Sequence, residues 1–130
     1  MHPIHLCLVD DEVDLLRTFE LFYEDEVADN FMQIKAFTLA ESCLEYLKTP
    51  EGKKTELLLT DITMPKMDGY TLTQEALTLI PDLKVYICSA YNSPEYKNRA
   101  KDLGVSGFLC KPLNFEELLE KIENDFHKSA

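Results

Sequence analysis

The sequence lacks the features of a membrane protein, a secreted protein or a metal-thiolate site. No apolar run approaches the roughly 18 residues of a membrane span, and the N-terminus has neither the basic nor the apolar region of a signal peptide. The four cysteines form no C-x-x-C pair, and the three histidines form no cluster. We therefore expect a cytoplasmic protein with reduced cysteines, of which Cys7, Cys88 and Cys110 are buried within apolar runs.

Basic residues are also scarce. Lysine and arginine total 13 against 24 aspartates and glutamates, which gives a formal net charge of -11. This charge repels nucleic-acid backbones and anionic bilayers, so we expect no direct binding to nucleic acid or membrane. With 130 residues, 45% of them apolar, and no linker or repeat, the chain is expected to form one domain over residues 1–130.

Short apolar runs alternate with amphipathic helical patterns five times along the chain. The predicted strands are residues 4–9, 33–37, 56–60, 84–88 and 105–110. The clearest helical stripes are Leu16, Phe19, Tyr23 and Val27; Ala40, Cys43, Leu44 and Leu47; and Phe115, Leu118, Leu119, Ile122 and Phe126. Nearly continuous apolar strands, each followed by a helix, predict a doubly wound α/β domain with helices on both faces of a parallel sheet.

Capping residues mark the expected helix boundaries. The expected N-terminal caps are Thr38 with Glu41, Ser93 before Pro94, and Asn114 with Glu117, while Gly104 suits the position just past a helix end. Asp68 before Gly69 indicates a turn or a cap on the third helix, so Asp68 is expected to be structural.

Polar residues follow four of the five predicted strands. Asp10 and Asp11 follow the first strand, Asp61 the third, Ser89 the fourth and Lys111 the fifth. In a doubly wound sheet, ligands bind outside the carboxyl ends of the strands. These five residues are therefore expected to form one site.

Three aspartates at one edge of a sheet need a counter-charge. Two unit charges 4 Å apart repel by roughly 4 kcal/mol at an effective dielectric of 20. Raised pKa values or a bound cation relieve this repulsion, and Mg²⁺ suits a carboxylate site that also leaves room for phosphate oxygens. With the ammonium of Lys111 beside them, the aspartates favour a phosphoryl-transfer site with a carboxylate nucleophile. Spacing alone does not identify which aspartate reacts.

Residues 61–69, with the sequence DITMPKMDG, resemble the phosphoacceptor motif of response regulator receiver domains, the CheY-like superfamily of two-component signalling. The other motifs of the family occur in order: VDDE at residues 9–12, SA at residues 89–90 and GFLCKP at residues 107–112. The resemblance runs from Ile4 to about Phe126. It implies a flavodoxin-like (βα)5 fold with a five-stranded parallel sheet in the order 2-1-3-4-5.

The resemblance also implies a role for each residue of the predicted site. Asp61 would be the phosphoacceptor. Asp10, Asp11 and Asp61, with the backbone carbonyl of Thr63, would bind Mg²⁺. Lys111 would pair with Asp61 or with its phosphoryl group, and the peptide bond after Lys111 is expected to be cis.

The resemblance implies a conformational switch as well. Ser89 would move to bond a phosphoryl oxygen, and Phe108 would turn inward into the space that Ser89 vacates. Thr63 and Tyr91, each two positions beyond a site residue, are expected to tune hydrolysis by water. Signal output, and any dimer, would use the surface of the fourth helix, fifth strand and fifth helix within residues 93–126.

By this resemblance, the chain is a phosphorylation-activated switch of a phosphorelay. A sensor histidine kinase or a histidine phosphotransfer protein would supply the phosphoryl group, and a downstream protein or a tethered output domain would receive the signal. The 130 residues are expected to hold no output domain. The only chemistry expected is Mg²⁺-dependent self-phosphorylation and self-dephosphorylation, so the chain is not expected to be an enzyme with a separate substrate.

The alternative function is a phosphorylation-independent interaction module on the same fold. Departures at the site would favour this alternative, but the only departure is Ser89 in place of the commoner threonine. A flavin-binding domain would need a hydroxyl- and glycine-rich loop after the first strand, where this chain has acidic residues. A phosphatase of the haloacid-dehalogenase type would need D-x-D, but position 63 is Thr63.

Overall fold

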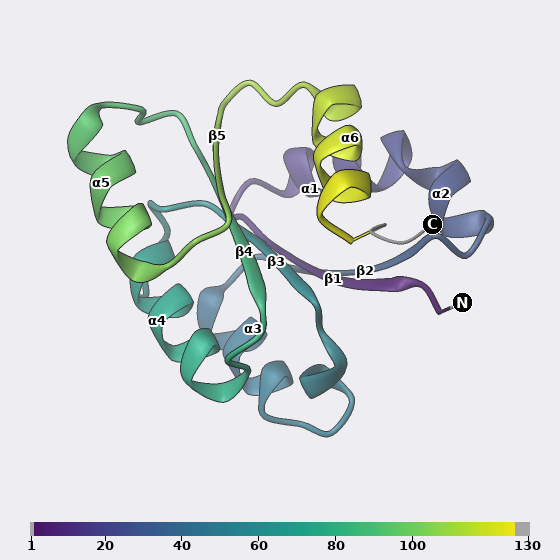
Figure 1. The fold of residues 1–130 in the computed structure, drawn as a ribbon, viewed down its shortest axis with the longest axis horizontal. Helices are drawn as coiled ribbons and strands as arrows, with labels where there is room; N and C mark the ends of the chain where they lie inside the picture. The colour runs from purple at the N-terminus through teal and green to yellow at the C-terminus, as the bar shows by residue number, and fades with distance from the viewer. Residues whose placement is uncertain (1, 127–130) are drawn as a thin grey trace.

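A five-stranded parallel sheet forms the centre of the computed structural model, which describes residues 2–126 (Figure 1). The strands are β1 Ile4–Val9, β2 Met32–Phe37, β3 Leu57–Thr60, β4 Lys84–Ser89 and β5 Gly107–Cys110. Their spatial order is β2-β1-β3-β4-β5, and all neighbouring pairs are parallel. The doubly wound fold and its 2-1-3-4-5 order are therefore confirmed.

Helices cover both faces of the sheet. They are α1 Val13–Phe22, α2 Glu24–Ala28, α3 Ala40–Leu47, α4 Gly69–Leu79, α5 Pro94–Leu103 and α6 Phe115–Phe126, with a 3-10 turn at Gly52–Lys54. In Figure 1, α1 and α6 lie on one side of the sheet, and α3, α4 and α5 lie on the other. Among the described residues, no helix is both long and apolar enough to cross a bilayer.

The strands divide the apolar core into two layers. Successive side chains of a strand point to opposite faces of the sheet. In β1, Leu6 and Leu8 pack in the layer beneath α1 and α6, whereas Cys7 and Val9 pack in the layer beneath α3, α4 and α5. Burial on both faces explains why the strands appear in the sequence as continuous apolar runs.

The first predicted helix is wrong in its second half. Tyr23 ends α1, is fully buried, and donates from its hydroxyl to the carbonyl oxygen of Phe115 at 2.6 Å. The chain therefore turns at Tyr23 and continues as the separate helix α2. Val27 lies in α2 and is 41% exposed, so it does not continue the buried stripe.

The caps agree with the sequence except at α3. Asn114 Oδ1 accepts from the N–H of Glu117 at 3.0 Å, and Gly104 ends α5 at a φ of 89°. Ser93 is the N-cap of α5, although its side chain makes no capping hydrogen bond. The Thr38 cap is wrong, because α3 begins one residue later and Leu39 occupies the N-cap position.

Burial of the cysteines is confirmed at two of the three predicted positions. Cys7 and Cys88 are buried, and Cys43 is buried too. The burial predicted for Cys110 is wrong, because this residue ends the edge strand β5 and its side chain reaches solvent. All four thiols are free.

Candidate functional site

Strand pairing brings two of the predicted aspartates to the same level of the sheet. Val9 at the end of β1 pairs with Thr60 at the end of β3. Asp10 and Asp61 follow these residues directly, and each has its backbone anchored. The N–H of Asp10 donates to the carbonyl oxygen of Phe37 at 3.1 Å, and that of Asp61 to the carbonyl oxygen of Val9 at 3.2 Å. The sheet itself therefore positions both carboxylates.

The three predicted aspartates do gather. One carboxylate oxygen from each of Asp10, Asp11 and Asp61 lies within 4.8 Å of the other two. Asp10 is 2% exposed and Asp61 is 9% exposed, whereas Asp11 faces solvent. The cluster therefore has two carboxylates set into the sheet edge and a third at its mouth.

The ammonium of Lys111 bridges the cluster. Its Nζ donates to Asp10 Oδ2 at 2.7 Å and to Asp61 Oδ2 at 3.1 Å. Lys111 follows β5, whereas the two aspartates follow β1 and β3, so three separate strands supply this contact. The peptide bond from Lys111 to Pro112 is cis, as expected.

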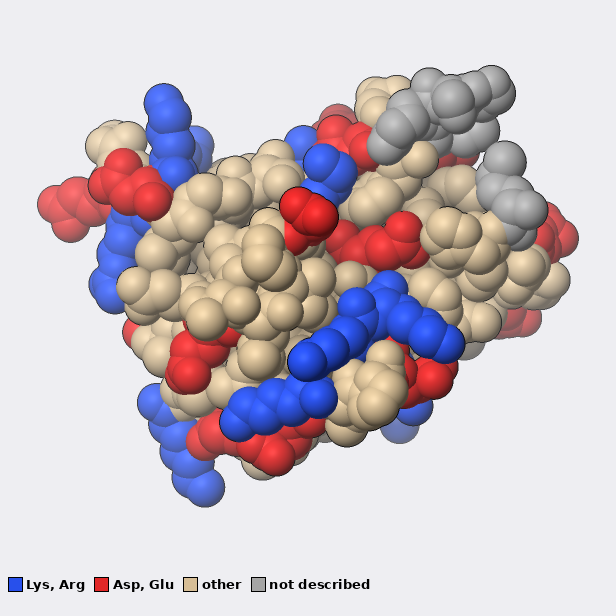
Figure 2. All heavy atoms as spheres, turned by 60° about the horizontal axis from the view of Figure 1, so that its bottom comes forward, with Lys and Arg blue, Asp and Glu red and all other residues tan. Residues whose placement is uncertain are grey.

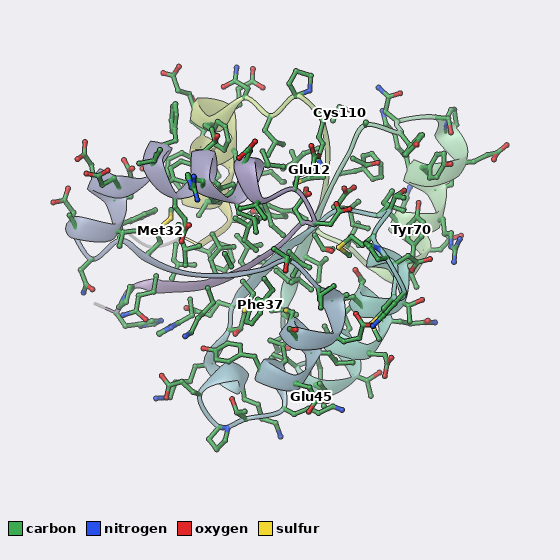
Figure 3. The ribbon with its side chains drawn as sticks, turned by 180° about the vertical axis from the view of Figure 1, so that it is seen from behind. Glu12, Met32, Phe37, Glu45, Tyr70 and Cys110 are labelled. Carbon is green, nitrogen blue, oxygen red and sulfur yellow. The ribbon has the colours of Figure 1, made fainter. Side chains whose placement is uncertain are left out.

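Glu12, which was not among the predicted site residues, adds a further carboxylate that contacts Lys111. Glu12 Oε1 lies 3.4 Å from Lys111 Nζ, and the N–H of Glu12 donates to Asp10 Oδ1 at 2.9 Å (Figure 3 labels Glu12). The feature of the sequence that could have indicated Glu12 is its position directly after Asp10 and Asp11. One ammonium thus contacts three carboxylates, and Asp11 adds a fourth to the cluster. This deficit of positive charge favours a bound cation.

Burial and charge shift the pKa values of the central pair. Burial raises the pKa of Asp61, and the neighbouring charge of Asp10 raises it further, although Lys111 acts in the opposite direction. Burial would lower the pKa of Lys111, but its hydrogen bonds with Asp10 and Asp61 and their charges outweigh that effect and raise it. Lys111 is therefore a permanent cation, whereas the charged form of Asp61 is disfavoured by its surroundings.

The loop after Asp61 is closed by backbone contacts. The N–H of Ile62 donates to Asp61 Oδ1 at 2.7 Å, and the N–H of Gly69 donates to the carbonyl oxygen of Ile62 at 2.8 Å. Asp68 is the N-cap of α4 and accepts from the N–H of Thr71 at 2.8 Å, which confirms its structural role. A Cβ at Gly69 would lie 1.9 Å from the carbonyl oxygen of Asp61, so this position requires glycine.

The other predicted residues lie at the end of β4, in β5 and in the loops that follow β3 and β4. Ser89 is the buried last residue of β4; its Oγ accepts from the N–H of Tyr91 at 2.9 Å, and its carbonyl accepts from the N–H of Lys111. Phe108 in β5 is half-buried against the core layer of α3, α4 and α5. Thr63 and Tyr91 are exposed. Within residues 2–126, none of these four side chains hydrogen-bonds to the aspartates or to Lys111.

The site is an open cluster rather than a pocket for an organic molecule. A cavity of about 560 Å³ is lined by other residues, including His2, Ile4 and Phe31, around the amino ends of β1 and β2. The space enclosed beside Asp10 and Asp61 measures only about 10 Å³. An ion and a phosphoryl group held at the surface fit this geometry better than a buried substrate.

Comparisons with known proteins identify the family. The profile described as the response regulator receiver domain matches residues 6–123. The transcriptional regulatory protein GlrR of Escherichia coli is 32% identical over 128 residues, which are 98% of this chain but 27% of that protein. The chemotaxis protein CheY of Listeria monocytogenes is 31% identical over 120 residues, covering 92% of this chain and 96% of CheY.

A solved structure shows the same fold. The CheY-like receiver domain protein of Methanospirillum hungatei superposes with a TM-score of 0.85 at 25% identity, covering 97% of this chain and 95% of that one. The chain therefore spans about a quarter of GlrR but nearly the whole of the Listeria CheY and of the Methanospirillum chain. With its sheet order, its aspartate cluster and its matched profile, the chain belongs to the response regulator receiver domain family.

Proposed function

We propose that this chain is a phosphorylation-activated signalling switch in which Asp61 accepts the phosphoryl group. The observation that carries the proposal is the contact of the Lys111 ammonium with Asp10 and Asp61 inside a cluster of three aspartates. Asp61 is the one member of the cluster that lies at the start of the closed loop 61–69 and also contacts Lys111. Its carboxylate is therefore held in one orientation for reaction.

The carboxylates also suit a magnesium ion. Asp10, Asp11 and Asp61 offer hard oxygen ligands within reach of one another, and the carbonyl oxygen of Thr63 is the further ligand we expect. When bound, Mg²⁺ would neutralise charge on the transferring phosphoryl oxygens. Lys111 contributes the second positive charge and stays protonated, as its raised pKa requires.

The phosphoryl donor that we propose is a phosphohistidine of a sensor kinase or a phosphotransfer protein. An Asp61 carboxylate oxygen attacks the phosphorus, a P–O bond forms, and the P–N bond breaks. The bonding electron pair stays on the histidine nitrogen, which takes up a proton. Hydrolysis later returns the Asp61 carboxylate and inorganic phosphate, so the chain acts on itself and on no separate substrate.

Phosphorylation would act through Ser89 and Phe108. Ser89 Oγ exchanges its hydrogen bond with the Tyr91 N–H for one with the phosphoryl group, and Phe108 moves into the space that becomes free. Shifting a population from about 1:99 to about 99:1 needs roughly 5.5 kcal/mol. Two hydrogen bonds to a charged group, at about 1.5 to 3 kcal/mol each, are of that size.

The output surface that we propose is formed by α5, β5 and α6, the fourth helix, fifth strand and fifth helix of the sequence analysis. A downstream protein, a tethered output domain or a second copy of the chain would bind there. Figure 2 shows a band of basic side chains across the lower part of one face, with acidic side chains beside it. The net charge of -11 nevertheless disfavours direct nucleic-acid binding. The free thiols support a reducing compartment, and we infer a cytoplasmic location.

Acetyl phosphate with Mg²⁺, followed by intact-mass analysis, tests the proposal. The parent protein should gain the mass of one phosphoryl group, and Asp61→Asn should gain none. No addition to the parent would favour the alternative, a phosphorylation-independent interaction module on the same fold. An equal gain of phosphoryl mass by Asp61→Asn would show that another residue is the phosphoacceptor.

Thr63 and Tyr91 are proposed to tune hydrolysis, because both are exposed and each lies two residues beyond a site residue, where it can order or exclude water. Substituting both residues by alanine and following the decay of the phosphorylated mass tests this role. An unchanged lifetime would contradict it.

A further inference from the structure

Three tyrosines meet at the first turn of α5. Tyr96, the third residue of this helix, has its ring stacked on Tyr91, with centroids 5.4 Å apart and planes 26° apart. The hydroxyl of Tyr70, in the first turn of α4, donates to the backbone carbonyl of Tyr96 at 3.0 Å. In Figure 3, Tyr70 lies on the side of the molecule that carries α4 and α5.

The first of these contacts leads back to Ser89. Its Oγ accepts from the N–H of Tyr91 at 2.9 Å. The orientation of the Ser89 side chain therefore holds the backbone of the residue whose ring lies on Tyr96.

The second contact leads back to Asp61. The Asp61 carboxylate accepts from the N–H of Ile62, and the Ile62 carbonyl accepts from the N–H of Gly69 at 2.8 Å. Tyr70 follows Gly69 directly, so any shift of the closed loop 61–69 moves the Tyr70 ring. The guanidinium carbon of Arg99 lies 4.2 Å from the centroid of this ring, so Tyr70 makes a second contact with α5.

Helix α5 contributes little to the fully buried core, although Tyr96 and Leu103 are partly buried against it. Ala100 is its only buried residue among those described, whereas α4 has five. A helix with so few buried apolar contacts takes its position from the remaining specific contacts at its surface. Tyr91 is itself 52% exposed, so its stack on Tyr96 can open at small cost.

We propose that Tyr96 is the positioning residue through which the state of the phosphorylation site reaches α5, by two routes: the Tyr91 ring from Ser89 and the Tyr70 hydroxyl from Asp61. The inference deepens the proposed switch and rests on it. When Ser89 Oγ turns toward the phosphoryl group, the N–H of Tyr91 loses its acceptor, and the segment 90–93 must rearrange to satisfy it. The Tyr91–Tyr96 stack carries that rearrangement into the helix.

Amide hydrogen exchange of residues 94–103, with and without beryllofluoride and Mg²⁺, tests the proposal. Binding of beryllofluoride at the site is verified separately by ¹⁹F NMR, and variants are compared at saturation. In the parent, exchange in α5 should change by about fivefold, the size expected for one hydrogen bond. Tyr70→Phe and Tyr91→Leu should each lose part of this change, and the double variant should lose most of it.

Tyr46→Phe is the matched control, because it removes a tyrosine hydroxyl from α3 rather than from either proposed route to α5; the Tyr46 ring packs on Phe37. It should respond like the parent. A full α5 response in the double variant, with beryllofluoride bound, would overturn the inference and leave the proposed switch intact. Absence of bound beryllofluoride in the parent would instead overturn the proposed switch.

A measurement on the unphosphorylated protein tests the route through Tyr91 independently of the proposed switch. Ser89→Ala removes the acceptor of the Tyr91 N–H without any phosphoryl group, so exchange at the start of α5 should accelerate. In a Tyr91→Leu background, the same substitution should have little further effect, because the stack that transmits it is already lost. Fully additive effects of the two substitutions would contradict the route through Tyr91.

Discussion

Asp61 carries a negative charge where only 9% of its surface reaches solvent. Desolvation is the largest influence on its carboxyl group and raises its pKa above the ordinary 3.8, despite the hydrogen bond from Lys111. A metal ion that binds this carboxylate would supply the missing counter-charge, so its binding would relieve the unfavourable free energy of the buried charge. The same residue that we propose as the phosphoacceptor is therefore expected to weaken the fold.

Replacing Asp61 by Asn should stabilise the metal-free protein at neutral pH by about 1 kcal/mol, the scale of ordinary single substitutions. A carboxyl whose pKa is raised by folding is protonated more readily in the folded state, so its penalty is full above the folded pKa. The penalty declines as the pH falls toward 3.8, and the advantage of Asp61→Asn should decline with it. Urea unfolding in EDTA at several pH values measures the difference.

Asp68→Asn is the control for this prediction. Asparagine caps a helix as well as aspartate does, so this variant should leave the free energy of unfolding nearly unchanged. An Asp61→Asn protein less stable than the parent at neutral pH would show that its bond with Lys111 outweighs desolvation.

At the scale of elements, the junction between β3 and α4 is the most constrained. The first residue of α4, Gly69, approaches the Asp61 carbonyl so closely that no side chain fits between them. Gly69→Ala should cost about 2 to 3 kcal/mol, the upper range for a forced contact in a packed region, and should slow phosphorylation by acetyl phosphate. Thermal unfolding and intact-mass time courses measure the two effects.

Gly104→Ala is the matched comparison. Gly104 has a φ of 89°, but an added Cβ would meet nothing within 4 Å. The substitution should cost about 1 kcal/mol from backbone strain alone and leave the phosphorylation rate unchanged. If both alanine variants slowed phosphorylation equally, the effect of Gly69 would be general destabilisation rather than a contact with Asp61.

The two predicted capping pairs should also differ in their energies. Asn114 accepts from the N–H of Glu117, whereas the side chain of Thr38 makes no capping bond to α3. Asn114→Ala should therefore lower the free energy of unfolding by about 1 kcal/mol, and Thr38→Ala should change it little. Urea unfolding of both variants measures the difference. An equal loss of unfolding free energy in the two variants would show that Thr38 also caps α3.

For the whole molecule, the excess of acid makes stability depend on cations. The net charge is -11, and at the site three carboxylates contact one lysine while a fourth, Asp11, lies in the same aspartate cluster. A ligand that binds only the folded state stabilises it by mass action, so Mg²⁺ at ten times its dissociation constant should add about 1.4 kcal/mol to the free energy of unfolding. Chelation by EDTA should remove this gain.

Screening of the overall charge must be separated from binding. NaCl at matched ionic strength screens the surface without occupying the site, so it should give a smaller gain. Asp11→Asn removes an exposed carboxylate that we propose as a ligand, and should weaken the Mg²⁺ effect with little change in the metal-free stability. Equal gains from NaCl and from Mg²⁺ in the parent would contradict a specific site.

Local patterns predicted most of the fold because they follow from local physics. The strand at residues 4–9 agrees with β1, and Asn114 and Gly104 lie at helix ends, because apolar runs and caps act within a few residues. The first helix is shorter than predicted, because it ends at Tyr23, whose hydroxyl donates to the carbonyl oxygen of Phe115 far away in the sequence. The apolar spacing within the first helix cannot predict a contact with so distant a residue.

The sequence by itself determined the doubly wound sheet and the residues that follow its strands, because strand length, helical spacing and the motif at residues 61–69 are properties of adjacent residues. Only the tertiary structure decided that Glu12 joins Lys111, that Gly69 lies against the Asp61 carbonyl, and that Tyr70 reaches α5. Each of these depends on the separation of atoms from distant segments. Strand register and helix packing fix such separations, and the order of residues along the chain does not express them.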